Sequence, residues 1–273
     1  MSIGIRVALG INQADPVFRR RSRLRLAALI SPLLFLLVWA GVTKLEIFSP
    51  QLLVSPLEVL RSLHELLDSG ELWDHLSVSL SRLGLGFVLG ASSGLLFGIL
   101  MALSRTVEDF FSPLFQALRQ VPTIALIPIF ILLFGIEELF KIAIVTKAAF
   151  FTVALSSYEA TKGVPKNYFE VAQAYKLPTW TLYSKVVIPA ILPPILTGFR
   201  IAFSRSWTIL VAAELLAADS GLGHMMQMGR EVFRIDIVMV GVVLTGLIGF
   251  GIDRIFKWGE ANLIPWRKTE GKQ

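Results

Sequence analysis

Three ionisable side chains stand inside stretches of sequence that are otherwise almost uncharged. Lys147 lies five residues into an apolar run, Arg205 lies in the middle of another, and Glu214 follows in the segment VAAEL. Charged groups are costly in hydrocarbon, so such residues usually face protein or water and serve a function there. The two cations are suited to binding an anion that crosses a membrane, and Trp207 could line the same route.

A purely structural explanation is open for each of these side chains. Glu214 could pair with a cation from a neighbouring helix, and Trp207 could simply pack. Arg82 and Arg200 lie nearer the ends of their runs, where we expect them to extend toward the polar boundary of the membrane. The candidate solute route comprises Lys147, Arg205, Trp207 and Glu214.

A second candidate site is a polar segment that contains several prolines. The segment EVAQAYKLPTWTLYSKVVIPAILPP, residues 170–194, separates two membrane-length apolar runs. Its apolar residues recur at helical spacing until Leu177-Pro178, where proline disfavours helix at the preceding residue. The pattern predicts two short helices joined by a bend. Since a long loop with its own amphipathic pattern is more often functional than idle, we expect a surface for a soluble partner rather than a plain solvated loop.

The remaining sequence holds little that could catalyse a reaction. No G-x-x-x-x-G-K-[ST] loop is present to cradle ATP phosphates. The chain has no cysteine, and His64, His75 and His224 are not spaced as metal ligands, so we expect no metal site and no catalytic centre. The net charge of +6 does not indicate nucleic acid, because the cationic loops of a membrane protein give the same sum.

The composition predicts that membrane-spanning helices position these residues. Hydrophobic residues make up 54% of the 273, charged residues only 17%, and the mean hydropathy is +0.67. A helix needs about 20 apolar residues to cross the hydrocarbon core. We predict an all-α membrane protein with six spans in these apolar runs: residues 26–43, 83–103, 121–136, 142–158, a fifth beginning after Pro194, and 237–252.

The first and third runs differ from the others. Run 26–43 is longer than the apolar part of a secretory signal, which favours a retained span over a cleaved signal. Run 121–136 is short and contains two prolines, so its span is expected to begin earlier, near Pro113. The predicted domains are an N-terminal tail at 1–24, a transmembrane domain at 25–258 with a loop at about 159–190, and a C-terminal tail at 259–273.

Lysine and arginine are distributed unevenly over this arrangement. The segments before the first span, around 159–190 and after the sixth span hold most of them, as do Arg105 and Arg119. Cytoplasmic loops carry such an excess. We therefore predict that both termini and the 159–190 loop are cytoplasmic.

Two local patterns predict details of packing. Gly86, Gly90, Gly94 and Gly98 recur every fourth residue and would line one helical face, against which a neighbouring backbone can pack closely. Leucines at helical spacing after Ser55-Pro56 predict a short amphipathic helix with serine as its cap, on the outer surface.

The polar segment and its surroundings resemble permeases of ATP-binding-cassette importers. Those proteins share a cytoplasmic pattern of E-A-A, three residues, G, nine residues and I-x-L-P. Here Glu170-Val171-Ala172 opens the pattern, and the spacing runs without a gap to Val186, Ile188 and Pro189, with Lys176 at the glycine position. The stretches LRQVPTIALIPIFILLFGI and ILTGFRIAFSRSWTILVAAELLAADSGLGHM are similar to permeases for taurine, aliphatic sulfonates and nitrate. The resemblance covers roughly residues 25–267.

This resemblance implies a type I importer permease, a multi-pass protein of a bacterial inner membrane surrounded by lipid. It implies a homodimer of permeases, two copies of an ATPase subunit that hold ATP and Mg, and a periplasmic or lipid-anchored substrate-binding protein. This chain would carry no cofactor. The segment that docks on the ATPase would comprise Glu170, Val171, Ala172, Ala174, Tyr175, Lys176, Leu177, Pro178 and Pro189.

The predicted function is transport of a small organic anion such as an aliphatic sulfonate or taurine, with nitrate or another small solute as the alternative. A secondary transporter that needs no ATPase would show internal repeats with broken helices, and no second copy of the 170–194 pattern is found. We further hypothesise that Lys176 extends the first short helix and offers its ammonium group to an acidic residue of the ATPase.

Overall fold

The described residues fold into helices joined by turns and loops, with no strand among them, as the sequence predicts. The computed structural model describes residues 16–49 and 52–264, with side chains from residue 30 onward. Residues 1–15 of the predicted tail 1–24 and residues 265–273 of the predicted tail 259–273 lie outside the described residues. The elements are α1 (Pro16–Lys44), α2 (Pro56–Asp68), α3 (Glu71–Leu103), α4 (Arg105–Gln120), η1 (Thr123–Leu126), α5 (Ile127–Phe134), α6 (Glu138–Lys162), α7 (Lys166–Ala174), α8 (Thr179–Leu182), η2 (Tyr183–Val187), α9 (Ile188–Leu216), α10 (Leu222–Glu231) and α11 (Ile235–Leu263).

The chain divides into two compact units, residues 1–60 and 61–273. Within the first, the indole nitrogen of Trp39 donates to the carbonyl oxygen of Val54 at 3.0 Å. The hydroxyl of Ser55 accepts from the backbone N–H of Glu58 at 3.3 Å, so it caps α2 one residue before Pro56. This start of the amphipathic helix is the predicted one.

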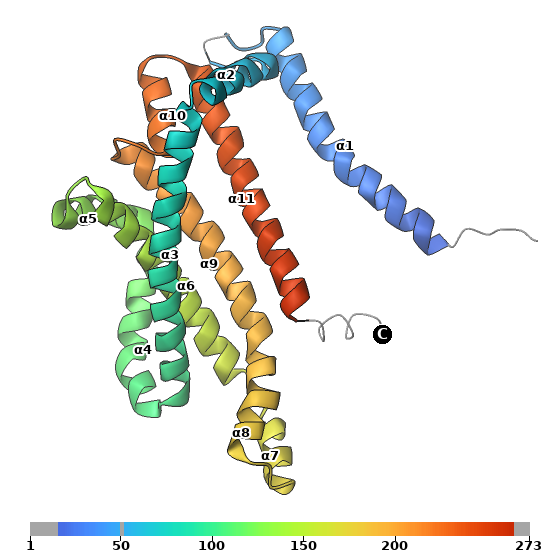
Figure 1. Cartoon of the computed structure of the whole chain (residues 1–273), viewed down its shortest axis with the longest axis vertical. Helices are drawn as coiled ribbons and strands as arrows, with labels where there is room; N and C mark the ends of the chain where they lie inside the picture. The colour runs from blue at the N-terminus through green and yellow to red at the C-terminus, as the bar shows by residue number, and fades with distance from the viewer. Residues whose placement is uncertain (1–15, 50–51, 265–273) are drawn as a thin grey trace, which may run out of the picture. The chain divides into compact units, whose positions relative to one another are not determined.

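The glycine seam is confirmed as the contact between α3 and α6, which run side by side in the second unit (Figure 1). A methyl group added at Gly94 would lie 2.6 Å from the carbonyl oxygen of Phe150, and one at Gly90 would overlap that of Thr146. Only glycine lets the two backbones approach this closely. The seam therefore fixes the position of α6 along α3.

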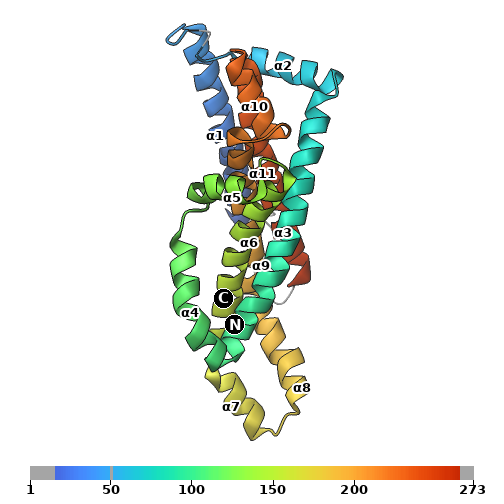
Figure 2. The ribbon, with the colours of Figure 1, turned by 90° about the vertical axis from the view of Figure 1, so that its left-hand side faces the viewer.

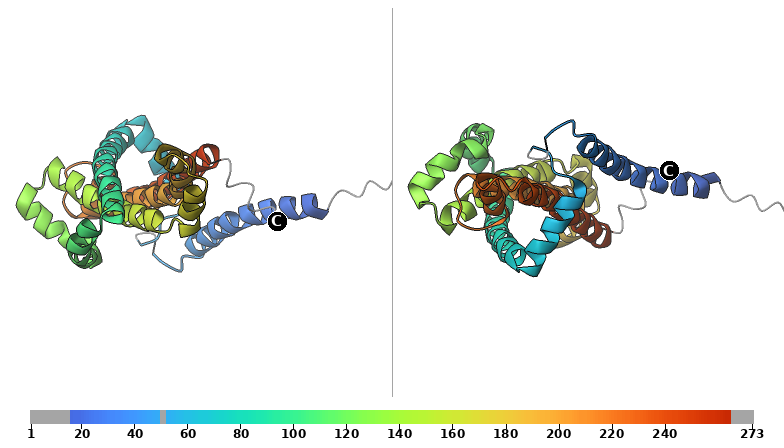
Figure 3. Two further views of the ribbon diagram at one scale, coloured as in Figure 1. Left: turned by 90° about the horizontal axis from the view of Figure 1, so that it is seen from below. Right: turned by 90° about the horizontal axis from the view of Figure 1, so that it is seen from above.

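The rest of the second unit is arranged around α3, α6 and α9. Helices α10 and α11 pack on α9, and α5 packs on α6. Seen end-on, α4 and α5 lie to one side of the three central helices (Figure 3). The short helices α7 and α8 lie at one end of the unit and α10 at the other (Figure 2).

The predicted third span is sharply bent instead of straight. Helices α4 and α5, with η1 between them, are together long and apolar enough for one span, but the chain bends by 88° at the break between them. Pro113 lies inside α4, and the break follows Val121-Pro122, where proline disfavours helix at the preceding residue. The described residues hold four helices able to cross a membrane, or five with this bent pair. The count of six and the cytoplasmic termini stay predictions.

The fifth span begins earlier than expected. Helix α9 starts at Ile188, continues through Pro193 and Pro194, and joins α8 through the π-helical turn η2, so that 179–216 forms one long helix. Only Pro189 lies in the first turn of α9, where a helix tolerates proline, whereas Pro193 and Pro194 lie inside the helix. The π-helical turn η2 just before α9 changes the backbone hydrogen-bond pattern next to these prolines. The prolines therefore do not end the helix, which was the basis of the expectation.

Candidate functional site

A cavity of about 810 Å³ opens between the bent third span, α6 and α9. Three of its lining residues are cations, Arg119 from the end of α4, Lys147 from α6 and Arg205 from α9. No Asp or Glu is among the lining residues in the described part of the chain. Besides Arg119, Lys147 and Arg205, the lining consists of Gln120, Thr123, Ile124, Ala148, Phe151, Thr152, Leu155, Ser156, Ile201, Ser204, Thr208, Ile209 and Ala212.

Lys147 holds the break of the third span against α6. Its Nζ donates to the carbonyl oxygen of Val121 and to the hydroxyl of Thr123, both at 3.0 Å. The same ammonium lies 5.5 Å from the ring centroid of Phe151, within cation–π range. An ammonium group has three protons, so these two bonds leave one donor for a further partner.

Arg205 and Arg119 are less engaged than Lys147. Arg205 is exposed on α9 and has no hydrogen bond or ion pair within the described residues. The Nε of Arg119 is buried, and no acceptor in that part of the chain reaches it. Sequence reasoning counted Arg119 only as a loop cation, because the fold that brings the end of α4 to α6 and α9 leaves no local signal.

The other predicted route residues lie away from this cavity. Glu214 belongs to a buried network, and Trp207 is buried, its indole N–H donating to the carbonyl oxygen of Thr245 at 3.0 Å. Neither lines the cavity. Of the four candidates, the structure brings Lys147 and Arg205 together and sets Trp207 and Glu214 apart.

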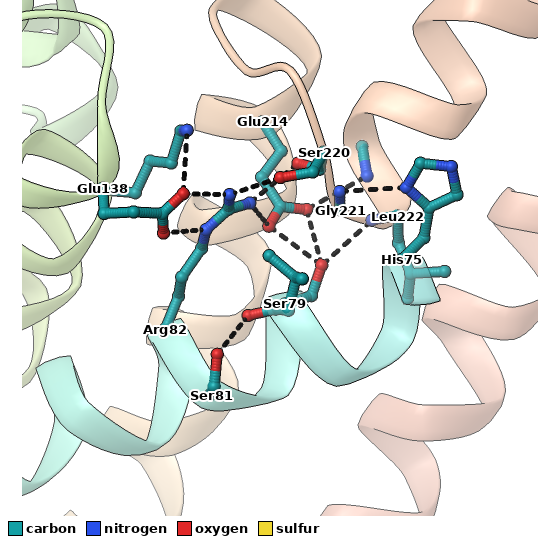
Figure 4. A network of polar contacts seen from close by, with 12 residues as sticks. His75, Ser79, Ser81, Arg82, Glu138, Glu214, Ser220, Gly221 and Leu222 are labelled. Atoms are coloured by element: carbon teal, nitrogen blue, oxygen red, sulfur yellow. Dashed lines mark hydrogen bonds and ion pairs between the residues drawn. The ribbon is translucent and has the colours of Figure 1, made fainter. Parts of the chain in front are cut away.

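The network around Glu214 is centred on Arg82 (Figure 4). The guanidinium of Arg82 forks onto the carboxylate of Glu138, with Nε to Oε2 at 2.6 Å, and Nη1 donates to Glu214 at 2.9 Å. Its remaining donors reach the carbonyl and hydroxyl oxygens of Ser220, both at 2.7 Å. All five N–H groups of Arg82 therefore have acceptors, the full capacity of the side chain.

The carboxylate of Glu214 in turn orders the loop before α10. It accepts from the Ser79 hydroxyl at 2.8 Å and from the backbone N–H of Gly223 at 3.1 Å. Gly221, with φ +107°, lies so close that an added methyl group would sit 2.5 Å from the Glu214 carboxyl carbon. His75 accepts from the N–H of Gly221 at 3.1 Å and lies beside His224. The network joins α3, α6, α9 and this loop.

The expectation that Arg82 and Arg200 extend to the membrane boundary is wrong for Arg82. The Arg82 side chain is 1% exposed and is held by two carboxylates. Arg200 lies within 3.8 Å of Asp253 and Glu260. Partners on other helices, 56 and 132 residues away for Arg82, decide these positions, and spacing along one helix does not reveal them.

The polar segment forms a protruding surface of exposed apolar side chains. Helices α7 and α8 are joined by a bend at residues 175–178, as predicted. Tyr175 is 77% exposed and Trp180 81% exposed, and Val171 is also exposed, whereas Ala172 is buried. Large aromatic residues exposed together at a polar end of the molecule are typical of a protein interface.

Lys176 does not extend α7, contrary to the hypothesis. It adopts the left-handed conformation with φ 49° directly after the helix. Its N–H bonds the carbonyl of Gln173, and the N–H of Leu177 bonds that of Ala172, which is the Schellman pattern of helix termination. The position therefore has the backbone geometry that favours glycine, occupied here by lysine at a conformational cost.

Comparisons with known proteins match the fold just described. Residues 94–264 match the family of binding-protein-dependent transport system inner membrane components. The chain belongs to this family. Among curated relatives, a Bacillus subtilis (strain 168) protein provisionally named as an aliphatic sulfonates transport permease is 35% identical over 94% of both chains. The taurine transport system permease of Escherichia coli (strain K12) is 35% identical over 85% of this chain and 86% of its own.

A solved structure supports the same fold. The crystal structure of an amino acid ABC transporter with histidines matches 74% of this chain and 97% of that chain, with a TM-score of 0.57 and 16% identity. Membership in the family and the apolar helices make this chain a multi-pass protein of the inner membrane. As a member of the family it is a translocating subunit of an ABC transporter.

Proposed function

We propose that this permease forms the translocation route of an ATP-driven importer for small organic anions, such as an aliphatic sulfonate or taurine. The relatives that match almost the whole chain are named for these solutes. The cavity supports the assignment, since Lys147 and Arg205 line it without a carboxylate among the described lining residues. Cations that face a water-accessible cavity inside the membrane favour an anionic solute.

The exposed surface of α7 and α8 is proposed as the docking site of a separate ATPase subunit. The exposure of this surface is the observation on which the proposed coupling of ATP hydrolysis to transport rests. Tyr175, Trp180 and Val171 offer apolar area, and Glu170 adds an exposed charge. The predicted docking residues Ala174, Lys176, Leu177 and Pro178 belong to the same surface, while Pro189 lies in the first turn of α9. Because η2 and α9 continue α8 without a break, movement of this surface would be transmitted directly to the helix that carries Arg205.

The remaining parts of the transporter lie on other chains. We propose that two ATPase subunits bind ATP and Mg and hydrolyse the nucleotide, one against each copy of a permease homodimer. A periplasmic or lipid-anchored binding protein would deliver the anion. Membership in a family defined by binding-protein-dependent transport supports this division of labour.

Co-purification tests the docking site. The chain would be co-expressed with its ATPase, and the ratio of the two proteins measured after purification in detergent. Glu170→Arg should reduce the ATPase bound, since it reverses a charge on the exposed face of α7. Glu231→Arg, the same change on α10 at the opposite end of the unit, should leave the ratio unchanged.

Two results would count against the proposal. Equal loss of ATPase in both variants would indicate general destabilisation rather than docking through α7. A wild-type chain that purifies alone would contradict an ATP-driven importer and favour a secondary transporter.

A further inference from the structure

The cations of the second unit differ in whether a carboxylate neutralises them. Arg82 and Lys141 pair with Glu138, Arg82 also with Glu214, and Arg200 lies beside Asp253 and Glu260. Within the described residues, Arg119, Lys147 and Arg205 have no carboxylate partner. These three come from separate segments, yet they line one cavity.

This grouping leaves positive charge without a counter-ion in an apolar part of the molecule. Taking such a charge out of water is expensive, and an opposite charge or well-placed acceptors must offset the cost. Lys147 has two neutral acceptors, whereas the buried Nε atom of half-buried Arg119 has none in the described chain. A bound anion would supply the missing acceptors of all three residues at once.

Three of the hydroxyl groups that line the cavity already donate their protons within the chain. Those of Thr152, Ser156 and Thr208 donate to carbonyl oxygens of their own helices at 3.0–3.1 Å. Their protons are thus engaged, and the oxygen atoms that remain are acceptors. The charged donors available to an anion in this cavity are the three cations, and the side chains of Gln120, Thr123 and Ser204 add neutral donors to the lining.

We propose that the cavity is an anion-binding site in which Arg119 and Arg205 bind an oxyanion group. The third N–H of the Lys147 ammonium group donates a hydrogen bond to the same oxyanion group. Arg119 is thereby added to the residues that contact the solute. The inference rests on the proposed function and deepens it. A guanidinium presents paired N–H groups that match two oxygens of a carboxylate, sulfonate or phosphate.

The lining also selects for the rest of the solute. Apolar side chains of Ile124, Phe151, Leu155, Ile201 and Ile209 surround the cations, which suits a short alkyl group. No carboxylate in the described lining could receive an ammonium group. The site therefore favours a simple alkyl anion over a zwitterion, so butane-1-sulfonate should bind more tightly than taurine.

Direct binding to the permease separates this inference from the selectivity of a binding protein. The permease would be purified with its ATPase in lipid nanodiscs, without binding protein, and binding of butane-1-sulfonate and of taurine measured by equilibrium dialysis. Butane-1-sulfonate should bind at least about tenfold more tightly than taurine. Arg119→Met and Arg205→Met should each weaken it about tenfold or more, the usual effect of losing one charged hydrogen bond.

Two further variants make the test specific. Arg254→Met removes an arginine of α11 outside the cavity and should leave binding unchanged. Thr208→Asp places a carboxylate in the lining and should shift the preference from butane-1-sulfonate toward taurine. This second variant tests the cavity even if an arginine variant fails to fold.

The outcomes distinguish the inference from the proposed function. Equal binding of both sulfonates, with no effect of the arginine variants or of Thr208→Asp, overturns the inference and leaves sulfonate transport standing. The absence of binding to the wild-type complex also overturns it, and if uptake with the binding protein is then absent as well, the proposed solute class falls too.

Discussion

The two clusters of charge in this permease share helices α6 and α9 but are built in opposite ways. Glu138 and Lys147 are nine residues apart on α6, and Arg205 and Glu214 are nine residues apart on α9, which is about 13 Å of helix in each case. At the α10 end, Arg82 is surrounded by carboxylates and serine oxygens. At the cavity, no carboxylate of the described chain pairs with Arg205 or Arg119.

This difference indicates which charges support the fold and which serve a solute. A fully paired arginine in a dry environment fixes the helices that contribute its partners. A cation that lacks a carboxylate partner contributes no ion pair to the fold. Its presence is therefore better explained by an ion that is not part of the chain.

The largest predicted effect is on the paired cluster. Arg82→Met should destabilise the protein by about 3–5 kcal/mol, because Glu214 stays buried without its counter-ion and Glu138 is left with Lys141 alone. Denaturant unfolding of the purified chain in micelles measures this change. Adding Glu214→Gln should recover part of the loss, and a single variant as stable as the wild type would show that the cluster contributes no stability.

The glycine seam positions both clusters, because it sets α6 against α3. Gly90→Ala would force a methyl group into the carbonyl of Thr146 and should cost about 1–3 kcal/mol, the typical cost of overpacking. Gly84→Ala, on the same helix with open space around it, is the matched control and should be neutral or slightly stabilising. Equal behaviour of the two variants in thermal unfolding would argue against the seam.

Substitution in the unpaired cluster should have little effect on stability and a large effect on transport, the reverse of substitution in the paired cluster. Arg205→Met should change the unfolding free energy by less than about 0.5 kcal/mol, since the side chain is exposed and pairs with nothing described. Uptake of butane-1-sulfonate by cells carrying the complete transporter should nevertheless fall about tenfold. Destabilisation comparable to that of Arg82→Met, with uptake retained, would reverse the comparison.

A position outside both clusters provides the baseline. Lys176→Gly should stabilise the end of α7 by about 1 kcal/mol or less, because glycine adopts positive φ without the cost that lysine bears. Ala174→Gly, two residues earlier at the last position of the helix, should destabilise it by a similar amount or less. Hydrogen exchange at the α7 amides would report both changes, and protection lowered by Lys176→Gly would contradict the left-handed conformation.

Features set by local spacing could be predicted from the sequence. The glycine seam, the Ser55-Pro56 helix start and the bend after α7 follow from residues within a few turns of one another. Family motifs added the fold class, and the docking segment that they indicate stays a prediction. The helical character of the chain followed from its composition.

Features set by distant partners could not. Arg82 and Glu214 are 132 residues apart, so no periodicity could show that they pair. Arg119, at the end of α4 just before the 88° bend of the third span, lines one cavity with Lys147 of α6 and Arg205 of α9, and tertiary packing alone brings these three helices together. The left-handed Lys176 was missed for a different reason, since propensity favours lysine in a helix and the Schellman bonds override it.

Thermal unfolding with and without butane-1-sulfonate tests the central claim most directly. A ligand that binds only the folded state raises the midpoint temperature. At one ligand concentration, we expect butane-1-sulfonate to raise the Tm of the wild-type complex clearly more than that of Arg205→Met, while the two proteins unfold at the same temperature without it. An equal rise in both, or no rise in the wild type, would contradict an anion site built from the unpaired cations.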